Sequence, residues 1–294
     1  MSDESTAESS GVQRVAWVGL LGNLALCAVK FVAGTAGRSQ AVVADAVHSL
    51  SDSVTDVAVI VGARYWTRSA DADHPYGHRR IETLVTIFVG GVLLVAGLGV
   101  GWRAILSFRV QDQDTPSLIA LMAALLSVVC KELLYHLTMK RGKELKSRSL
   151  QANALHHRSD AFSSIPASAA VACALFFPDW QFLDTVGAVV VAVFILHAAY
   201  RIIWPALSEI TEHGAPSEVR AMITEIAAAV EGVKEVHGFR SRYVGSHLHI
   251  DLHALVEASM RVDAAHEIAS TISRRVIREV SDVRDVVVHI EPEN

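Results

Sequence analysis

The chain has 294 residues, of which 51% are hydrophobic and only 19% are charged. Because charged residues make up about 25% of an average soluble protein, this composition indicates a membrane protein. Residues 210–294 carry 9 Lys or Arg and 14 Asp or Glu, which accounts for the whole formal net charge of −5. A nucleic-acid partner does not fit a chain without a basic excess, and a disulfide scaffold does not fit three cysteines that all lie in apolar runs.

Five segments are close to the roughly 20 mainly apolar residues that a bilayer crossing requires, and residues 40–66 are a sixth candidate, so six spans are predicted. They cover residues 15–36, 40–66, 83–102, 116–137, 161–177 and 184–204, the last ending at Trp204-Pro205. The second segment is unusual, since its core contains Asp45, His48, Asp52 and Asp56. Such groups are costly in a membrane unless they face the interior of the bundle, and this cost indicates a functional site.

The sequence also predicts how the chain is divided and oriented. Residues 1–13 are expected to be a disordered polar leader, and residues 14–208 a six-helix transmembrane domain. Lys and Arg are concentrated at residues 64–80 and 140–148. By the positive-inside rule, both termini are predicted to lie in the cytoplasm of a protein integral to the cytoplasmic membrane.

Residues 209–294 have the pattern of a small cytoplasmic α+β domain. A helix is predicted to begin at Pro216-Ser217, and two alternating strands, 235–244 and 246–256, flank Gly245. A helix at about 263–280 and a strand at 284–290 complete an αββαβ order. The predicted fold is therefore a polytopic α-helical membrane protein with an open three-stranded sheet and two helices at its C-terminal end.

Two His-x-x-x-Asp pairs, His48/Asp52 and His156/Asp160, occur in the second and fifth predicted spans. Residues four apart share one helix face, so two facing helices could offer two imidazole nitrogens and two carboxylate oxygens. This set suits a four-coordinate divalent ion, Zn²⁺ above all, although Fe²⁺, Co²⁺ and Cd²⁺ also accept it. The alternative for any single residue is a polar group hydrogen-bonded inside the bundle, which is the role that we favour for Asp45 and Asp56.

Two further groups of potential ligands lie outside the spans. The loop after the second span contains Asp71, His74 and His78, which form either a second metal site or an ordinary solvated loop. In the tail, His247, His249, Asp251 and His253 alternate with apolar residues, so that one face of the strand is rich in ligands. The same domain contains these further candidates: His237, His266, His289 and Glu291.

Taken together, these motifs resemble the cation diffusion facilitator family of divalent metal/proton antiporters, over residues 14–291. The resemblance rests on ADAVHSLSD in the second span, DADHPYGH in the following loop, LHHRSD in the fifth span and the His-rich αββαβ tail. It implies a transport site of His48, Asp52, His156 and Asp160, and a loop site of Asp71, His74 and His78. It further implies a binuclear tail site formed by His237, His253, His266, His289 and Glu291.

The resemblance also implies a homodimer, a ferredoxin-like or metallochaperone-like tail, alternating access, and a charge interlock between Arg80 and Glu212. Histidine at position 48 is similar to the zinc-preferring branch of the family, whereas Glu291 stands where an Asp is usual. The function expected is efflux of a divalent cation, Zn²⁺ first, in exchange for protons across the lipid bilayer. Protons compete with the metal because imidazole and carboxylate ligands must be deprotonated to bind it.

Two other classes of function remain open from the residues alone. An intramembrane metallohydrolase would use zinc to activate water, but the sequence has no HExxH helix, and four protein ligands would leave no position for water. A membrane-anchored metal sensor or scaffold without flux would need the tail ligands but not the pairs in the spans. We expect no enzyme activity.

Overall fold

The computed structural model describes residues 2–108, 115–144, 148–245 and 247–293. Within these ranges, the side chains of residues 2–16 and of some further helical positions, Asp56 among them, are outside the description. The chain divides into two compact units. The first comprises Met1–Val61 and Phe88–Ile203, and the second comprises Gly62–Ile87 and Trp204–Asn294.

Six long helices follow one another before the tail, as the hydropathy pattern predicts. They are α1 (Ser2–Ala36), α2 (Gln40–Trp66), α3 (Arg80–Ser107), α4 (Leu118–Glu144), α5 (Arg148–Phe176) and α6 (Phe182–Ile210), with a short 3-10 helix, η1 (Pro178–Trp180), before α6. Among the described residues, α1, α3, α4, α5 and α6 each contain a stretch that is long and apolar enough to cross a membrane, and α2 is 27 residues long. Asp45, His48 and Asp52 interrupt the apolar sequence of α2.

Two helix ends differ from the sequence-based expectation. Helix α1 begins at Ser2 and so includes most of the stretch expected to be a disordered leader. Helix α6 continues through Pro205 and ends at Ile210, whereas the last span was expected to end at Trp204-Pro205. A proline inside a long helix removes one backbone hydrogen bond. Spanning helices accommodate this loss because local adjustments and neighbouring groups satisfy the freed backbone carbonyl.

The helices of the first unit bury small and polar side chains and expose large apolar ones. Ala41, Ala167 and Ala188 are buried, whereas Val95 is 71% exposed. A Cβ atom at Gly187 would lie 2.6 Å from the Ala170 Cβ, so glycine permits α6 to approach α5 closely. Small residues allow such close contact between spanning helices, and the exposed apolar surface is suited to lipid.

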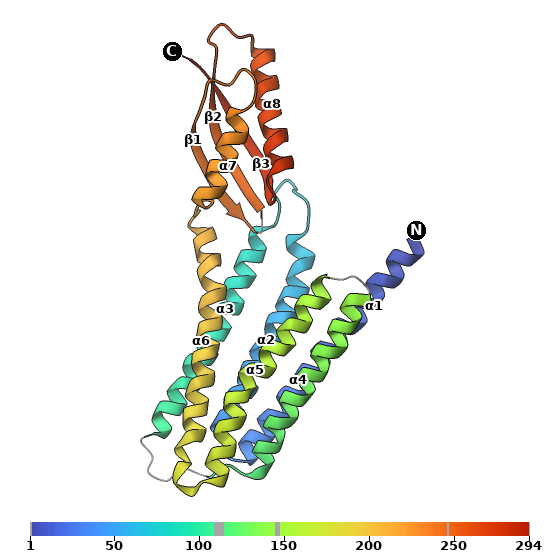
Figure 1. Cartoon of the computed structure of the whole chain (residues 1–294), viewed down its shortest axis with the longest axis vertical. Coiled ribbons are helices and arrows are strands. Elements are labelled where there is room, and N and C mark those ends of the chain that lie inside the picture. The colour runs from blue at the N-terminus through green and yellow to red at the C-terminus, as the bar shows by residue number, and fades with distance from the viewer. Residues whose placement is uncertain (1, 109–114, 145–147, 246, 294) are drawn as a thin grey trace. The chain divides into compact units, whose positions relative to one another are not determined.

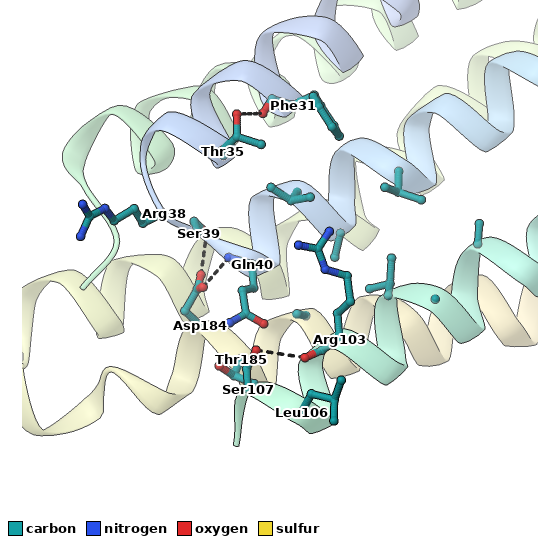
Figure 2. A pocket seen from close by; sticks show the side chains of 18 of the residues that line it. Phe31, Thr35, Arg38, Ser39, Gln40, Arg103, Leu106, Ser107, Asp184 and Thr185 are labelled. Carbon is teal, nitrogen blue, oxygen red and sulfur yellow. Dashed lines mark hydrogen bonds between the residues drawn. The ribbon is translucent and has the colours of Figure 1, made fainter. Parts of the chain in front are cut away.

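Asp184 at the start of α6 caps the N-terminus of α2. Its carboxylate accepts hydrogen bonds from the Ser39 hydroxyl and the Gln40 backbone N–H, each at 2.6 Å (Figure 2). These contacts lie beside a cavity of about 830 Å³ that α1, α2, α3 and α6 line. Figure 2 shows Arg103 of α3 extending into the same region. The cap fixes the first turn of the helix that contains His48 and Asp52.

The tail has the predicted αββαβ order. It consists of α7 (Ser217–Ala228), β1 (Glu235–Val244), β2 (His247–Val256), α8 (Val262–Glu279) and β3 (Val283–Pro292), and the strands form one sheet in the order β1-β2-β3 (Figure 1). β1 pairs antiparallel with β2, and β2 pairs parallel with β3. The even-numbered residues of β2, Leu248 to Ala254, are buried with Ile223 of α7 and Ile272 of α8. The odd-numbered residues therefore face away from this core.

Candidate metal centre

Three of the four ligands predicted in the spans come together in the first unit. His48, Asp52 and Asp160 each offer a ligand atom, and these atoms lie within 4.8 Å of one another. His48 and Asp52 are one turn apart on α2, with the His48 Nε2 3.9 Å from the Asp52 Oδ2. Asp160 belongs to α5, so the group joins two helices that are distant in the sequence.

His156 lies at the edge of this group. Its Nδ1 is 3.8 Å from the Asp160 Oδ1, but its side chain is 44% exposed, and it is not among the three mutually close ligands. Within the described chain, the His48 Nδ1, the Asp52 Oδ2 and the Asp160 Oδ2 are buried without a hydrogen-bond partner. Buried polar atoms are normally satisfied, so the open His48 Nδ1 and Asp52 Oδ2 are consistent with binding a cation, whereas the Asp160 Oδ2 lies within ion-pair distance of a lysine.

Two buried lysines, which the sequence pattern did not single out as functional, adjoin the group. Lys30 of α1 forms an ion pair of 3.0 Å with Asp45, whose other oxygen accepts a hydrogen bond from the Ser164 hydroxyl at 2.8 Å. Asp45 is thus engaged in contacts between helices, which supports the structural role expected for it. Lys131 of α4 lies 3.5 Å from Asp160. A lysine inside an otherwise apolar run was the signal available in the sequence for both.

The loop candidates converge in the second unit. Asp71 lies 3.5 Å from the His74 Nδ1 through its Oδ1 and 3.3 Å from the His78 Nε2 through its Oδ2. The backbone N–H groups of His74 and Asp73 donate to the Asp71 Oδ1, at 2.7 and 3.1 Å. These contacts, with the backbone bond from His74 as the main cause, hold the pKa of Asp71 below its ordinary value. The carboxylate therefore stays ionised down to a lower pH than an ordinary aspartate.

A third group lies on the sheet of the tail. Strand pairing places His237 opposite His253, and His253 opposite His289. The Glu291 carboxylate lies 2.8 Å from the His253 Nδ1, 3.1 Å from the His237 Nε2 and 3.6 Å from the His289 Nε2. Of these, His237, His253 and Glu291 are mutually close enough to share an ion.

Local backbone geometry makes this convergence possible. The β1–β2 register shifts between His237 and Arg240, and Gly238 has a φ of +60°. A Cβ at Gly238 would lie 2.8 Å from the ring of His253, so glycine is required by both the backbone and the neighbouring ring. His266 lies exposed on α8 and is not brought into any of the close groups found among the described residues.

The two additional histidines of β2 have other partners. His249 Nδ1 lies 3.6 Å from the Asp285 Oδ2, and His247 Nδ1 lies 3.2 Å from the Arg79 Nη1. Burial lowers the pKa of His247, and the positive charge of Arg79 lowers it further. Burial also lowers the pKa of His249, against the opposing effect of Asp285. Both imidazoles therefore favour the neutral form.

Acidic residues at the end of α6 hold the second unit together. Glu209 Oε1 accepts hydrogen bonds from the Thr83 hydroxyl at 2.7 Å and from the Gly245 backbone N–H at 2.6 Å. The Arg80 Nη2 and the Glu212 Oε1, the pair implied by the family resemblance, are 3.4 Å apart and exposed. Nothing in the local sequence distinguishes Glu209 from a solvated glutamate at a helix end, so this role could not be predicted.

Comparison with known proteins identifies both parts of the chain. Residues 16–211 match the cation efflux transmembrane domain, and residues 215–293 match the cation efflux protein cytoplasmic domain. The manganese efflux system protein MneP of Bacillus subtilis is 31% identical, over 95% of this chain and 96% of its own length. Metal tolerance protein C1 of Arabidopsis thaliana is also 31% identical over 95% of this chain, which spans 62% of that longer protein.

The magnetosome protein MamB of a Magnetospira strain is 27% identical over 95% of this chain and 94% of its own length. A solved variant of the MamM C-terminal domain is 30% identical, covers 26% of this chain and 96% of its own, and gives a TM-score of 0.26. The two domain matches together cover nearly the whole chain. The transmembrane match falls on the long helices, and the cytoplasmic match falls on the domain with the sheet. The chain therefore belongs to the cation diffusion facilitator family of metal efflux transporters.

Proposed function

We propose that this transporter exports a divalent cation, Zn²⁺ first, in exchange for protons, as a homodimer that alternates between two open states. The observation that carries the proposal is the meeting of His48, Asp52 and Asp160 inside the first unit, with His156 beside Asp160. Two imidazoles and two carboxylates match the ligand number and type that zinc prefers. The cytoplasmic membrane, with both termini in the cytoplasm, is the location that the distribution of Lys and Arg supports.

Metal preference is the finer part of the proposal. Two relatives carry manganese efflux in their names, and manganese favours carboxylate, carbonyl and water ligands. His48 and His156 supply nitrogen instead, which favours Zn²⁺ and leaves Fe²⁺, Co²⁺ and Cd²⁺ as competitors. We therefore expect zinc to be transported in preference to manganese.

Proton exchange follows from ligand chemistry. Histidine has an unperturbed pKa of about 6.5, so its protonation changes between a neutral cytoplasm and a more acidic exterior. A site open to the cytoplasm binds the cation with deprotonated ligands, and a site open to the acidic side takes up protons and releases it. An inward proton gradient can thus drive outward metal flux.

The remaining groups support a regulatory role for metal outside the membrane. We assign the loop site to Asp71, His74 and His78, and the tail site to His237, His253, His289 and Glu291, with His266 as a further ligand. These groups would bind metal as its cytoplasmic concentration rises and favour the transport-competent homodimer. A metal sensor without flux would use the same tail residues, so flux itself must be measured.

The decisive experiment is metal flux into proteoliposomes under an imposed pH gradient. We expect zinc flux that exceeds manganese flux, and its near-complete loss in Asp52→Ala and His48→Ala. His136→Ala is the matched control, because His136 is an exposed histidine on α4 that contacts Glu132 and belongs to none of the three ligand groups found among the described residues. Flux that persists in Asp52→Ala, or no flux of any metal from folded protein, would contradict the proposal.

A further inference from the structure

A lysine on α4 lies beside one carboxylate of the intramembrane group, which consists of His48, Asp52 and Asp160. The Lys131 side chain is 1% exposed, and its Nζ lies 3.5 Å from the Asp160 Oδ2. The same ammonium donates a hydrogen bond of 3.3 Å to the Ser49 hydroxyl, one residue after His48. A buried ammonium is costly unless an anion balances it, and Asp160 is the carboxylate within ion-pair distance among the described residues.

The two buried lysines, Lys30 and Lys131, differ in the carboxylate that balances their charge. Lys30 also donates to the Ser49 hydroxyl, at 2.5 Å, but its charge is balanced by Asp45 at 3.0 Å. Asp45 is not one of the close ligands. Two ammonium groups thus meet at one hydroxyl, and only the charge of Lys131 is balanced by a residue of the intramembrane group.

Charge counting gives the consequence for a cation. Asp52 and Asp160 contribute two negative charges, and Lys131 offsets one of them. A divalent ion bound to both carboxylates would give a neutral assembly without Lys131 and a positive one with it. Because like charges repel strongly in a low-dielectric interior, the ion must compete with the ammonium for Asp160.

We propose that Lys131 is a tethered cation that competes with the transported metal for Asp160 and so keeps the affinity of the site low enough for release. It is a positioning residue and not a metal ligand, since an ammonium has no lone pair to donate. Between transport events its charge stabilises the buried carboxylate. This inference rests on the proposed function, because it assigns a role at the same transport site.

The test measures binding separately from transport. The full chain in nanodiscs, with His74→Ala and Glu291→Ala to remove the loop and tail sites, is titrated with Zn²⁺ alone by calorimetry. In this background Lys131→Met and Lys131→Gln remove the charge, and the glutamine variant retains a polar group for Ser49 if the methionine variant fails to fold. Lys131→Arg retains the charge, and Lys140→Gln removes an exposed charge from the same helix as the matched control.

We expect both neutral variants to bind zinc tighter by roughly tenfold or more, since removal of one nearby positive charge is worth at least that factor in a buried site. In proteoliposomes they should show a lower KM together with a lower kcat, because release becomes slow. Lys131→Arg and Lys140→Gln should bind zinc as the unsubstituted background does. Unchanged or weaker binding in folded Lys131→Gln would overturn the inference.

An Asp160→Ala variant in the same background separates this inference from the proposed function. If Asp160→Ala loses zinc binding but Lys131→Gln does not bind zinc more tightly, the proposed role of Lys131 is wrong and the proposed transport site stands. Zinc binding that is the same with and without Asp160 would remove the transport site itself.

Discussion

At the scale of single residues, histidines on one face of a strand differ in the charges beside them. His247 combines partial burial with the nearby positive charges of Arg79 and Arg284, which together outweigh the opposing effect of Asp282. His253 instead contacts the Glu291 carboxylate at 2.8 Å. Two histidines on the same face of β2 therefore contact partners of opposite charge. His247 lies beside a guanidinium, and His253 lies beside a carboxylate that is itself a candidate metal ligand.

The arrangement around His247 predicts a pH effect with a definite sign. Because its folded-state pKa is lowered, the stability contributed by neutral His247 is fully present above the unfolded value of about 6.5. It is lost as the pH falls from there through the lower folded-state pKa. Arg79→Gln should raise the pKa of His247, measured by NMR titration of the full chain, whereas Arg240→Gln should leave it unchanged. A pKa that stays constant in Arg79→Gln would show that the guanidinium is not a cause.

At the scale of elements, α2 depends on a cap that another helix supplies. Asp184 of α6 accepts hydrogen bonds from Ser39 and from the Gln40 N–H, so one carboxylate joins the ends of two helices. These hydrogen bonds offset part of the free-energy cost of burying the Asp184 carboxylate. The contact stabilises the helix that bears His48 and Asp52, far along the chain from the cap.

Asp184→Ala should lower the free energy of unfolding by about 1 to 2 kcal/mol, since helix caps are typically worth this amount. Thermal unfolding in detergent micelles measures the change. Asp179→Ala is the control, because Asp179 lies in η1 and makes none of the capping bonds to Ser39 and Gln40. Equal stability of the two variants would mean that α2 does not need this cap.

At the scale of the whole molecule, the loop between α2 and α3 belongs to the same compact unit as the tail. Glu209 joins Thr83 at the start of α3 to Gly245 in the hairpin turn, with bonds of 2.7 and 2.6 Å. The exposed Arg80–Glu212 pair, 3.4 Å apart, lies in the same unit. Partly buried hydrogen bonds and exposed ion pairs differ in strength, so these two glutamates should contribute unequally.

Glu209→Ala should destabilise the second unit by about 1 to 3 kcal/mol, because it leaves the Gly245 N–H without its acceptor. Glu212→Ala should cost about 0 to 1 kcal/mol, as is usual for an exposed ion pair. Hydrogen exchange at the Gly245 amide reports the difference. Faster exchange in Glu212→Ala than in Glu209→Ala would reverse the assignment.

The sequence by itself determined the element order of both parts of the chain. Long apolar runs specify spanning helices, because in lipid the backbone N–H and C=O groups must be hydrogen-bonded within the segment. The alternation in residues 247–254 specifies a strand, because successive side chains of a strand face opposite sides. Helical spacing alone placed His48 and Asp52 on one face. These are local properties, and local patterns are sufficient to read them.

Only the tertiary structure decided which distant groups meet. It brought Asp160 to His48 and Asp52, left His156 partly exposed and His266 outside the close groups of the described chain, and paired Lys131 with Asp160. It also turned Glu209 toward Gly245. Such contacts depend on helix rotation and on strand register, which are set by the packing of the whole unit and have no signature in a short stretch of sequence.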